Sequence, residues 1–214
     1  LAKIALPEGL SEIPASMFYG CQTVEEIVIP STVASIGNKA FFGCSNLKSL
    51  IFTETPEGQT PVDLVILDTP NGSSDNGYTN SPFYGCTSLK NIVLPERLTV
   101  IGRLAFGGLV SGRYGEKYIP PFESISLPST LKEIHEMAFL NARNLKTVTF
   151  ASGTTLSDAC DGKAFAIGKQ AFYYCTSLTE IALPTSSEAT YSIGDTAFAY
   201  TGLKEISIPK AVGW

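Results

Sequence analysis

The chain has 214 residues, of which 44% are hydrophobic and 16% are charged, and its formal net charge is −5. This composition excludes an intrinsically disordered chain, which has little apolar surface and a high net charge. The net negative charge also argues against a nucleic-acid partner, which would require a basic surface. No apolar run approaches the roughly 18 residues of a transmembrane segment, and no signal peptide is recognisable. We therefore expect a soluble, turn-rich and well-packed chain.

The chain opens with a pattern of apolar residues, Pro, Phe and Cys that returns 23 residues later. The first copy comprises Leu1, Ile4, Leu6, Pro7, Leu10, Ile13, Phe18 and Cys21, and the second comprises Val24, Ile27, Ile29, Pro30, Val33, Ile36, Phe41 and Cys44. Further copies start near Leu47, Leu89, Phe122, Leu145 and Leu178, and the first strand of another starts near Leu203. Copies of this length stack on one another to bury a continuous core. We predict one solenoid over residues 1–214, with about seven 23-residue repeats and one terminal strand.

Each repeat begins with a segment of the form L-x-x-I-x-L, which predicts a short strand whose apolar side chains point into the core. Pro follows at once and ends the strand, because it has no amide hydrogen to donate. Two further apolar positions cross the coil. An Ile-Gly pair and an Ala-Phe pair, as in Ile36-Gly37 and Ala40-Phe41, then turn the chain back. We expect this return segment to contain a short helical or 3-10 stretch.

The full pattern, L-x-x-I-x-L-P-x-x-L-x-x-I-G-x-x-A-F-x-x-C, resembles the BspA-like, or treponemal-type, bacterial leucine-rich repeat over nearly the whole chain outside its insertions. The Ile-Gly-x-x-Ala-Phe segment and the trailing Cys separate this class from ribonuclease-inhibitor-like repeats. The resemblance implies a right-handed β/α leucine-rich repeat solenoid, with a parallel sheet on its concave face and short helical, 3-10 and irregular segments on its convex face. It also implies an exported or cell-surface bacterial protein, since several relatives are adhesins that bind host matrix or mediate aggregation.

Three insertions interrupt the repeats, near residues 53–81, 107–121 and 151–166. Residues 62–68 of the first insertion are predicted to form an extra strand, which a turn-rich stretch follows. The second insertion presents Arg113, Tyr114 and Tyr118 as candidate contact residues. Loops on a rigid scaffold often carry binding functions. The alternative is neutral surface variation, because long insertions cost little free energy.

Four of the five cysteines occupy one position of the repeat: Cys21, Cys44, Cys86 and Cys175. We expect small, buried free thiols at this position, because aligned positions of stacked coils seldom meet the geometry of a disulfide. Cys160 lies outside this phase and is the thiol that we expect to be exposed.

His135 occupies a position that is glycine in most other repeats. One histidine cannot supply a metal cluster, and any Ser-His-Asp set would have to use it. We therefore expect His135 to be a surface or turn histidine and not a catalytic one. The sequence predicts no catalytic, cofactor or metal site.

The outward positions of the predicted strands form a candidate interaction surface: Lys3, Glu26, Val28, Ser49, Ile51, Asn91, Val93, Ser126, Thr149, Glu180 and Glu205. Its first half carries an apolar stripe, and its second half is rich in Ser, Thr and Glu. Strand propensity alone could account for the β-branched residues. Without a catalytic constellation, the sequence favours a noncatalytic module that binds a protein or a glycan. The alternatives are an accessory domain of a glycan-processing system and a structural spacer. At the solenoid ends we expect a neighbouring domain or a second copy of the chain.

Overall fold

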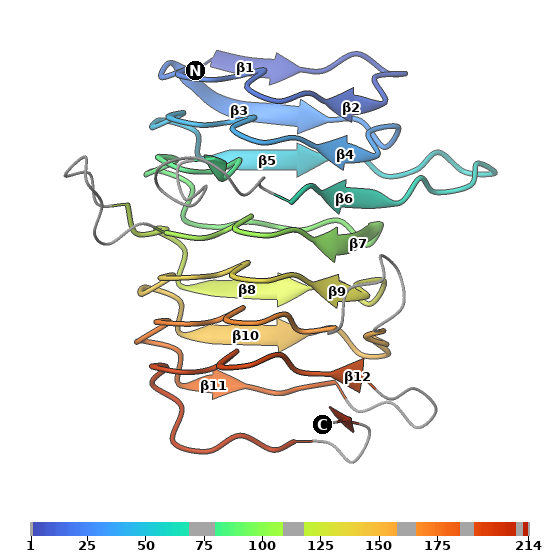
Figure 1. The fold of residues 1–214 in the computed structure, drawn as a ribbon. Coiled ribbons are helices and arrows are strands. Elements are labelled where there is room, and N and C mark those ends of the chain that lie inside the picture. Colours follow the sequence, from blue (N-terminus) through green and yellow to red (C-terminus); the bar gives the residue numbers. More distant parts are fainter. Residues whose placement is uncertain are drawn as a thin grey trace.

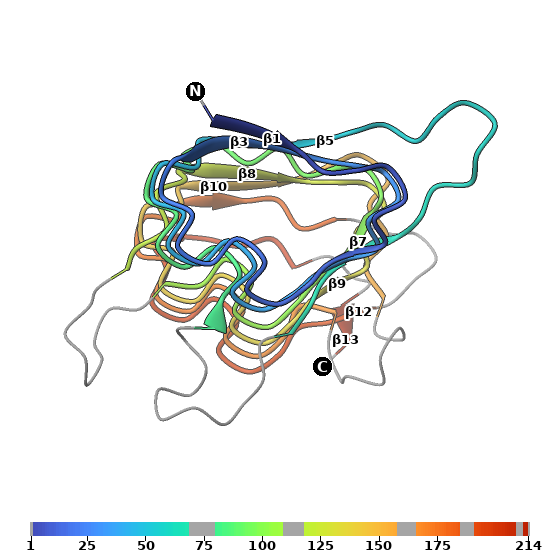
Figure 2. The same ribbon diagram turned by 90° about the horizontal axis from the view of Figure 1, so that it is seen from above.

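The chain folds as a stack of coils, which confirms the predicted repeat architecture (Figure 1). The computed structural model describes residues 2–68, 80–108, 118–157, 166–184, 191–208 and 212–213. Seen along the stack, successive coils superpose as a flattened ring with strands on two of its sides (Figure 2). We number the coils one to seven from the repeat starts given above.

The predicted strands of coils one to seven contribute to what we call the first sheet, in which all pairings are parallel, whereas the predicted terminal strand near Leu203 does not form, since residues 203–208 are irregular. Its first part has the order β1-β3-β5 and consists of β1 (Ala2–Ala5), β3 (Val24–Ile29) and β5 (Ser49–Phe52). Its second part has the order β11-β10-β8 and consists of β8 (Ser124–Leu127), β10 (Thr147–Phe150) and β11 (Glu180–Ile181). Coil four joins the second part through an isolated bridge between Val93 and Ser126.

The inward and outward positions of these strands alternate as the sequence predicts. In β8, Ile125 and Leu127 are buried, whereas Ser124 and Ser126 are exposed. This alternation follows from the pleat of the strand, in which successive side chains point to opposite faces. The predicted register is confirmed where strands pair, because Lys3 lies opposite Glu26 and Glu26 lies opposite Ser49.

A second parallel sheet, which the sequence analysis did not predict, lies on the opposite side of the ring. It has the order β2-β4-β6-β7-β9 and consists of β2 (Glu12–Ile13), β4 (Ser35–Ile36), β6 (Leu64–Ile66), β7 (Leu98–Ile101) and β9 (Glu133–Ile134). Isolated bridges continue it from Ile134 to Ile167 and from Ile167 to Ile193. At the far end, β12 (Tyr191–Ser192) pairs with β13 (Val212–Gly213).

The predicted extra strand within residues 62–68 is present as β6, but it is the regular strand of coil three. It pairs with β4 on one side and β7 on the other. The buried Ile66 therefore corresponds to the Ile of the Ile-Gly pair in other coils. Residues 53–63 leave the body of the solenoid as a projecting loop, whereas residues 64–66 return to it (Figure 2).

The expected short helical or 3-10 return segment is not confirmed: no α-helix occurs among the described residues, and Asn80 alone has 3-10 geometry there. In coil one the return segment consists of three overlapping turns, with hydrogen bonds from Met17 to Pro14, from Tyr19 to Ser16 and from Cys21 to Phe18. Ser16 has a φ of 62°, and positive φ also occurs at the equivalent residues Lys39, Leu104, Met137, Gln170 and Thr196. In five of the seven coils a second left-handed residue follows four positions later, and such positions are incompatible with a continuing helix and fit type II turns. The turns of neighbouring coils are joined by hydrogen bonds, such as Phe18 N to Ala40 O at 2.8 Å.

A column of phenylalanine rings runs through the core along the stack. Its members are Phe18, Phe41, Phe83, Phe106, Phe139, Phe172 and Phe198, and consecutive rings are stacked. The centroids of Phe139 and Phe172 are 4.9 Å apart, with the ring planes 4° from parallel. Such aromatic pairs contribute about 0.5–1.5 kcal/mol each beyond their buried area. The column explains why Phe and the small Ala before it recur in the sequence.

The repeated cysteines are free thiols, as predicted, and three of them are fully buried. Each of these three donates a hydrogen bond to the carbonyl of a Phe in the preceding coil: Cys44 to Phe18, Cys86 to Phe41 and Cys175 to Phe139, at 3.0, 3.1 and 3.2 Å. Burial raises the pKa of Cys44 to about 11 and that of Cys175 to about 12. Cys160 lies outside the described residues.

Candidate functional site

The outward side chains of the first sheet, which we call the first-sheet face, contain most of the predicted contact residues. The row nearest the strand starts is polar. Lys3 Nζ lies 2.6 Å from Glu26 Oε1, and Ser49 Oγ donates to Glu26 Oε2 at 3.5 Å. The charges of this row are therefore partly paired within the chain, which weakens the case for them as isolated contacts.

The next row along the strands is the more exposed and less charged one. Val28 lies opposite Ile51, Val93 bridges to Ser126, and Ser126 lies opposite Thr149. Val93 is 79% exposed and Ile51 is 40% exposed. The hydroxyls of Ser126 and Thr149 are 3.1 Å apart and form a hydrogen bond. The row thus presents aliphatic side chains in coils two to four and hydroxyls in coils five and six.

The first sheet is interrupted between coils three and four. No pairing links β5 with residues 91–94, although both segments are described. The projecting loop 53–63 leaves the body at this place (Figure 2). Val93 occupies an outward position and pairs only with Ser126, on the side of coil five, so its other side is not covered by a paired strand.

Arg97 fills the space that the projecting loop leaves inside the stack. Its side chain is buried, with 6% of the residue exposed. The guanidinium donates to the main-chain carbonyls of Pro30 at 3.1 Å and of Val62 at 3.3 Å, and also to that of Val33. Burial lowers the pKa of this guanidinium. Arg97 thus supplies hydrogen-bond donors to carbonyls of coils two and three.

Two hollows adjoin the carboxyl ends of the first-sheet strands. The first has a volume of about 430 Å³ and is lined by Ile92, Val93, Leu94, Glu96, Ser126, Leu127, Pro128, Thr149, Phe150 and Ala151. The second has a volume of about 280 Å³ and is lined by Thr53, Glu54, Thr55, Pro61, Asp63, Pro95, Glu96, Arg97 and Thr130. Glu96 lines both, so the hollows are neighbours. Val93, Ser126 and Thr149 are the predicted contact residues that the structure brings together here.

Other predicted contact residues lie apart from this region. Asn91 and Glu205 are exposed, and Glu180 is exposed opposite Thr147. Arg113 and Tyr114 lie outside the described residues.

The expectation that Tyr118 is an exposed contact residue is wrong. Tyr118 is 6% exposed, donates to Phe83 O at 3.0 Å, and packs against Tyr84 with a centroid distance of 4.8 Å. Burial raises its pKa well above the usual value. The aromatic ring covers the core beside coil three, so the end of the second insertion packs on the solenoid.

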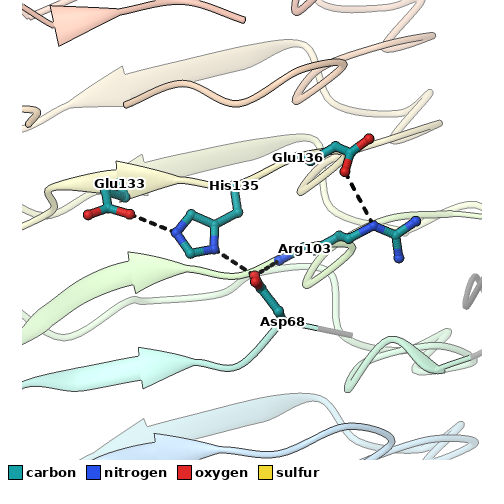
Figure 3. A network of polar contacts seen from close by, with 5 residues as sticks. All are labelled: Asp68, Arg103, Glu133, His135 and Glu136. Carbon is teal, nitrogen blue, oxygen red and sulfur yellow. Dashed lines mark hydrogen bonds and ion pairs between the residues drawn. The ribbon is translucent and has the colours of Figure 1, made fainter. Parts of the chain in front are cut away.

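The structure also shows a buried polar network that the sequence analysis missed (Figure 3). His135 is not a surface residue, because only 4% of it is exposed. Its Nδ1 lies 2.6 Å from Asp68 Oδ1, and its Nε2 lies 2.8 Å from Glu133 Oε2. The Arg103 amide donates to the same Asp68 oxygen at 2.6 Å, and the Arg103 guanidinium lies 3.7 Å from Glu136. The sequence signal that could have revealed this network is His135 itself, which stands where most other coils have glycine.

This network connects coils three, four and five. The imidazole has a carboxylate on each nitrogen, and Glu133 is 2% exposed. Within the described part of the chain, no group of three or more His, Cys, Asp or Glu side chains is arranged to hold a metal ion. The same residues include no helix with the length and apolarity of a membrane span.

Comparisons with known proteins agree with this architecture. The family model described as a BspA type leucine rich repeat region matches residues 1–58, 73–113 and 117–212, in six copies. No curated protein matches the chain.

Two solved bacterial structures are similar in fold. The leucine-rich repeat protein of T. pallidum (TpLRR) is 26% identical, with a TM-score of 0.57, and the match covers 90% of this chain and 72% of that one. A leucine-rich repeat protein of Bacteroides ovatus is also 26% identical, with a TM-score of 0.51, and the match covers 99% of this chain and 52% of that one. The chain therefore belongs to the BspA-type leucine-rich repeat family.

Proposed function

We propose that this chain is a noncatalytic recognition module of an exported or cell-surface bacterial protein, and that it binds a protein partner through the first-sheet face. The observation that carries the proposal is the exposure of Val93, which is 79%, at the centre of a row that runs from Ile51 to Thr149. Burial of such apolar surface contributes about 25 cal/mol per Å². The face therefore offers a partner both apolar contact and hydroxyl hydrogen bonds.

The arrangement suits association better than catalysis. The exposed hydroxyls of Ser126 and Thr149 bond to each other, and no histidine lies beside them, since His135 is held by Asp68 and Glu133. General acid–base work needs a positioned titratable group within hydrogen-bond reach of the substrate. The carboxylates of the neighbouring hollow could bond the hydroxyls of a glycan, which is the second candidate partner.

A glycan partner remains a second candidate for the same face. The hydroxyl pair and the carboxylates Glu54, Asp63 and Glu96 are groups that could bond sugar hydroxyls. Exposed aromatic rings, which stack on sugars, do not line either hollow, because Phe150 is partly buried against the core. We therefore propose a protein as the first candidate partner and a glycan as the second. Binding of either partner would support a role in adhesion.

The test is binding of the purified chain to immobilised extracellular-matrix proteins and to a glycan array. The Val93→Arg variant should lose the binding that the native chain shows. Leu67→Arg is the matched control, because Leu67 is an exposed aliphatic residue, 41% exposed, beyond the second sheet. Binding that is equal in both variants would contradict the use of the first-sheet face. Turnover of any bound glycan or protein would contradict a noncatalytic module.

A further inference from the structure

The two hollows at the end of the first sheet differ in chemistry although they share Glu96. The larger one is lined by the side chains of Val93, Leu94 and Phe150 together with the hydroxyls of Ser126 and Thr149. The smaller one is bounded by Glu54, Asp63 and Glu96, all of which are exposed. A hollow beside the exposed Val93 and a hollow bounded by three carboxylates thus lie side by side on the same edge of the solenoid.

The negative charge of the smaller hollow is not neutralised by its own lining. Arg97 is the one cationic residue among those that line it, and its guanidinium points to the carbonyls of Pro30 and Val62 inside the stack. Glu96 Oε2 accepts hydrogen bonds from Ser129 N at 3.1 Å and Ser129 Oγ at 2.8 Å. These donors are neutral and fix the position of the carboxylate.

The lining favours a cationic side chain in the smaller hollow and an aliphatic one in the larger. A Lys or Arg side chain would form charge-assisted hydrogen bonds with the carboxylates, which are stronger than bonds between neutral groups. An extended peptide advances about 3.3 Å per residue, so nearby residues can reach two neighbouring hollows. A free cation bound from solution would contact only the carboxylates of the smaller hollow and would leave Val93 exposed to water.

We propose that the two hollows bind an extended peptide segment that carries an aliphatic residue and, within a few residues of it, a Lys or Arg. The aliphatic side chain lies over Val93, and the cation lies among Glu54, Asp63 and Glu96. This inference rests on the proposed function, because it specifies the partner of the same face. The complementarity of charge and of apolar surface is what selects a basic peptide over a neutral glycan.

The test starts with a phage-displayed library of random heptapeptides, selected against the whole chain. The selected peptides should combine an aliphatic residue with Lys or Arg. One of them, made synthetically with a fluorescent label, should bind the Glu54→Gln/Asp63→Asn variant about tenfold more weakly, because charged contacts at an interface depend on both partners. Both substituted residues are exposed, so the fold is not at risk. Glu96 is left intact because it positions Ser129.

A charge reversal gives a second, independent readout. Selection against the Glu54→Lys/Asp63→Lys variant should favour Asp and Glu in place of Lys and Arg. Val93→Arg should abolish binding of the labelled peptide, and Leu67→Arg should leave it unchanged. The inference is overturned by selected peptides without a basic excess, by affinity that the double variants do not change, or by a library that yields no binder.

The same measurements separate this inference from the proposed function. If the native chain binds a matrix protein or a glycan and Val93→Arg removes that binding, the recognition module stands even when the peptide specificity fails. If the chain binds neither these probes nor any peptide, both proposals fail.

Discussion

His135 Nδ1 and Asp68 Oδ1 are 2.6 Å apart although the residues are separated by 67 positions in the sequence. Asp68 belongs to coil three and His135 to coil five. The Arg103 amide of coil four donates to the same oxygen at 2.6 Å. One carboxylate atom therefore joins three successive coils directly beside the second sheet (Figure 3).

Replacement of His135 by glycine should destabilise the chain even though glycine is the residue of most other coils. The substitution leaves Glu133, which is 2% exposed, without its imidazole partner. Loss of a hydrogen-bond partner from a buried polar group costs about 1–3 kcal/mol, and we expect about 2 kcal/mol in the free energy of unfolding from urea denaturation. The neighbouring Lys132→Ala variant is the control.

A double-mutant cycle shows whether that cost belongs to the pair. The variant Glu133→Ser/His135→Gly reproduces the Ser-Ile-Gly sequence of residues 35–37 and removes both partners of the buried hydrogen bond together. Its loss of stability should be smaller than the sum of the two single losses. Additive losses would show that the two side chains do not depend on each other.

Arg97 is expected to be the most sensitive of the arginines described. Its replacement by Met keeps much of the side-chain volume but removes the guanidinium donor from the carbonyls of Val33 and Val62 and leaves that of Pro30 with the Val33 amide alone. A buried polar group without a partner costs about 1–3 kcal/mol, so the urea midpoint should fall by an amount equivalent to at least about 2 kcal/mol. Arg97→Lys should recover only part of this, because a single ammonium cannot reproduce the planar fork of the guanidinium. An unchanged midpoint for Arg97→Met would contradict the role given to Arg97.

Gly168→Ala tests how closely neighbouring coils approach. A Cβ atom at residue 168 would lie 2.4 Å from the main-chain nitrogen of Glu136, which belongs to the preceding coil. The backbone cannot yield as a flexible side chain would, so we expect a loss of about 1–3 kcal/mol, as for other overpacked sites. The exposed neighbour substitution Lys169→Ala should change the melting temperature little. Equal melting temperatures for the two variants would show that the coils have more room than the structure indicates.

The buried thiols predict a pH dependence of stability. The native chain keeps the Cys44 and Cys175 protons up to about pH 11 and 12, whereas a thiol of an unfolded chain has a pKa of about 8.5. Above about pH 8.5 the unfolded state therefore binds fewer protons than the native state, and the free energy of unfolding falls as the pH rises toward 11. Below pH 8.5 these thiols should have no effect.

The control for this pH effect is Cys44→Ala/Cys175→Ala, since Ala142 occupies the same position in coil five. The difference in unfolding free energy between native and variant chains should decrease between pH 8 and pH 10. A difference that stays constant over this range would show that the thiols ionise in the native state.

The solenoid and the first sheet could be predicted from the sequence because the same type of residue returns at each core position of the repeat. Ile27, Phe41 and Cys44 have buried apolar counterparts in other coils, and Phe and Cys are three residues apart wherever both occur. The second sheet escaped prediction because each of its strands contributes so few residues, such as Ser35–Ile36, that no alternation is visible. The turns escaped because Lys39, at a φ of 55°, gives no sign of left-handed backbone.

The candidate site could be predicted only in part. The positions of Val93, Ser126 and Thr149 follow from the repeat phase, and the structure brings these residues together around one hollow. The acidic hollow depends on where loop 53–63 meets Glu96 and Arg97, which no repeat pattern encodes. The burial of Tyr118 has the same cause, because an insertion does not inherit the register of the repeat.

The most direct test of the account is a comparison of Val93→Arg and Leu67→Arg in binding to the matrix-protein and glycan panel, with folding of both verified by thermal melting. Both residues are exposed aliphatic side chains, but Val93 belongs to the first sheet whereas Leu67 directly follows β6 of the second. We predict that Val93→Arg loses the binding of the native chain and that Leu67→Arg retains it. Retention of binding by Val93→Arg would contradict recognition through the first-sheet face.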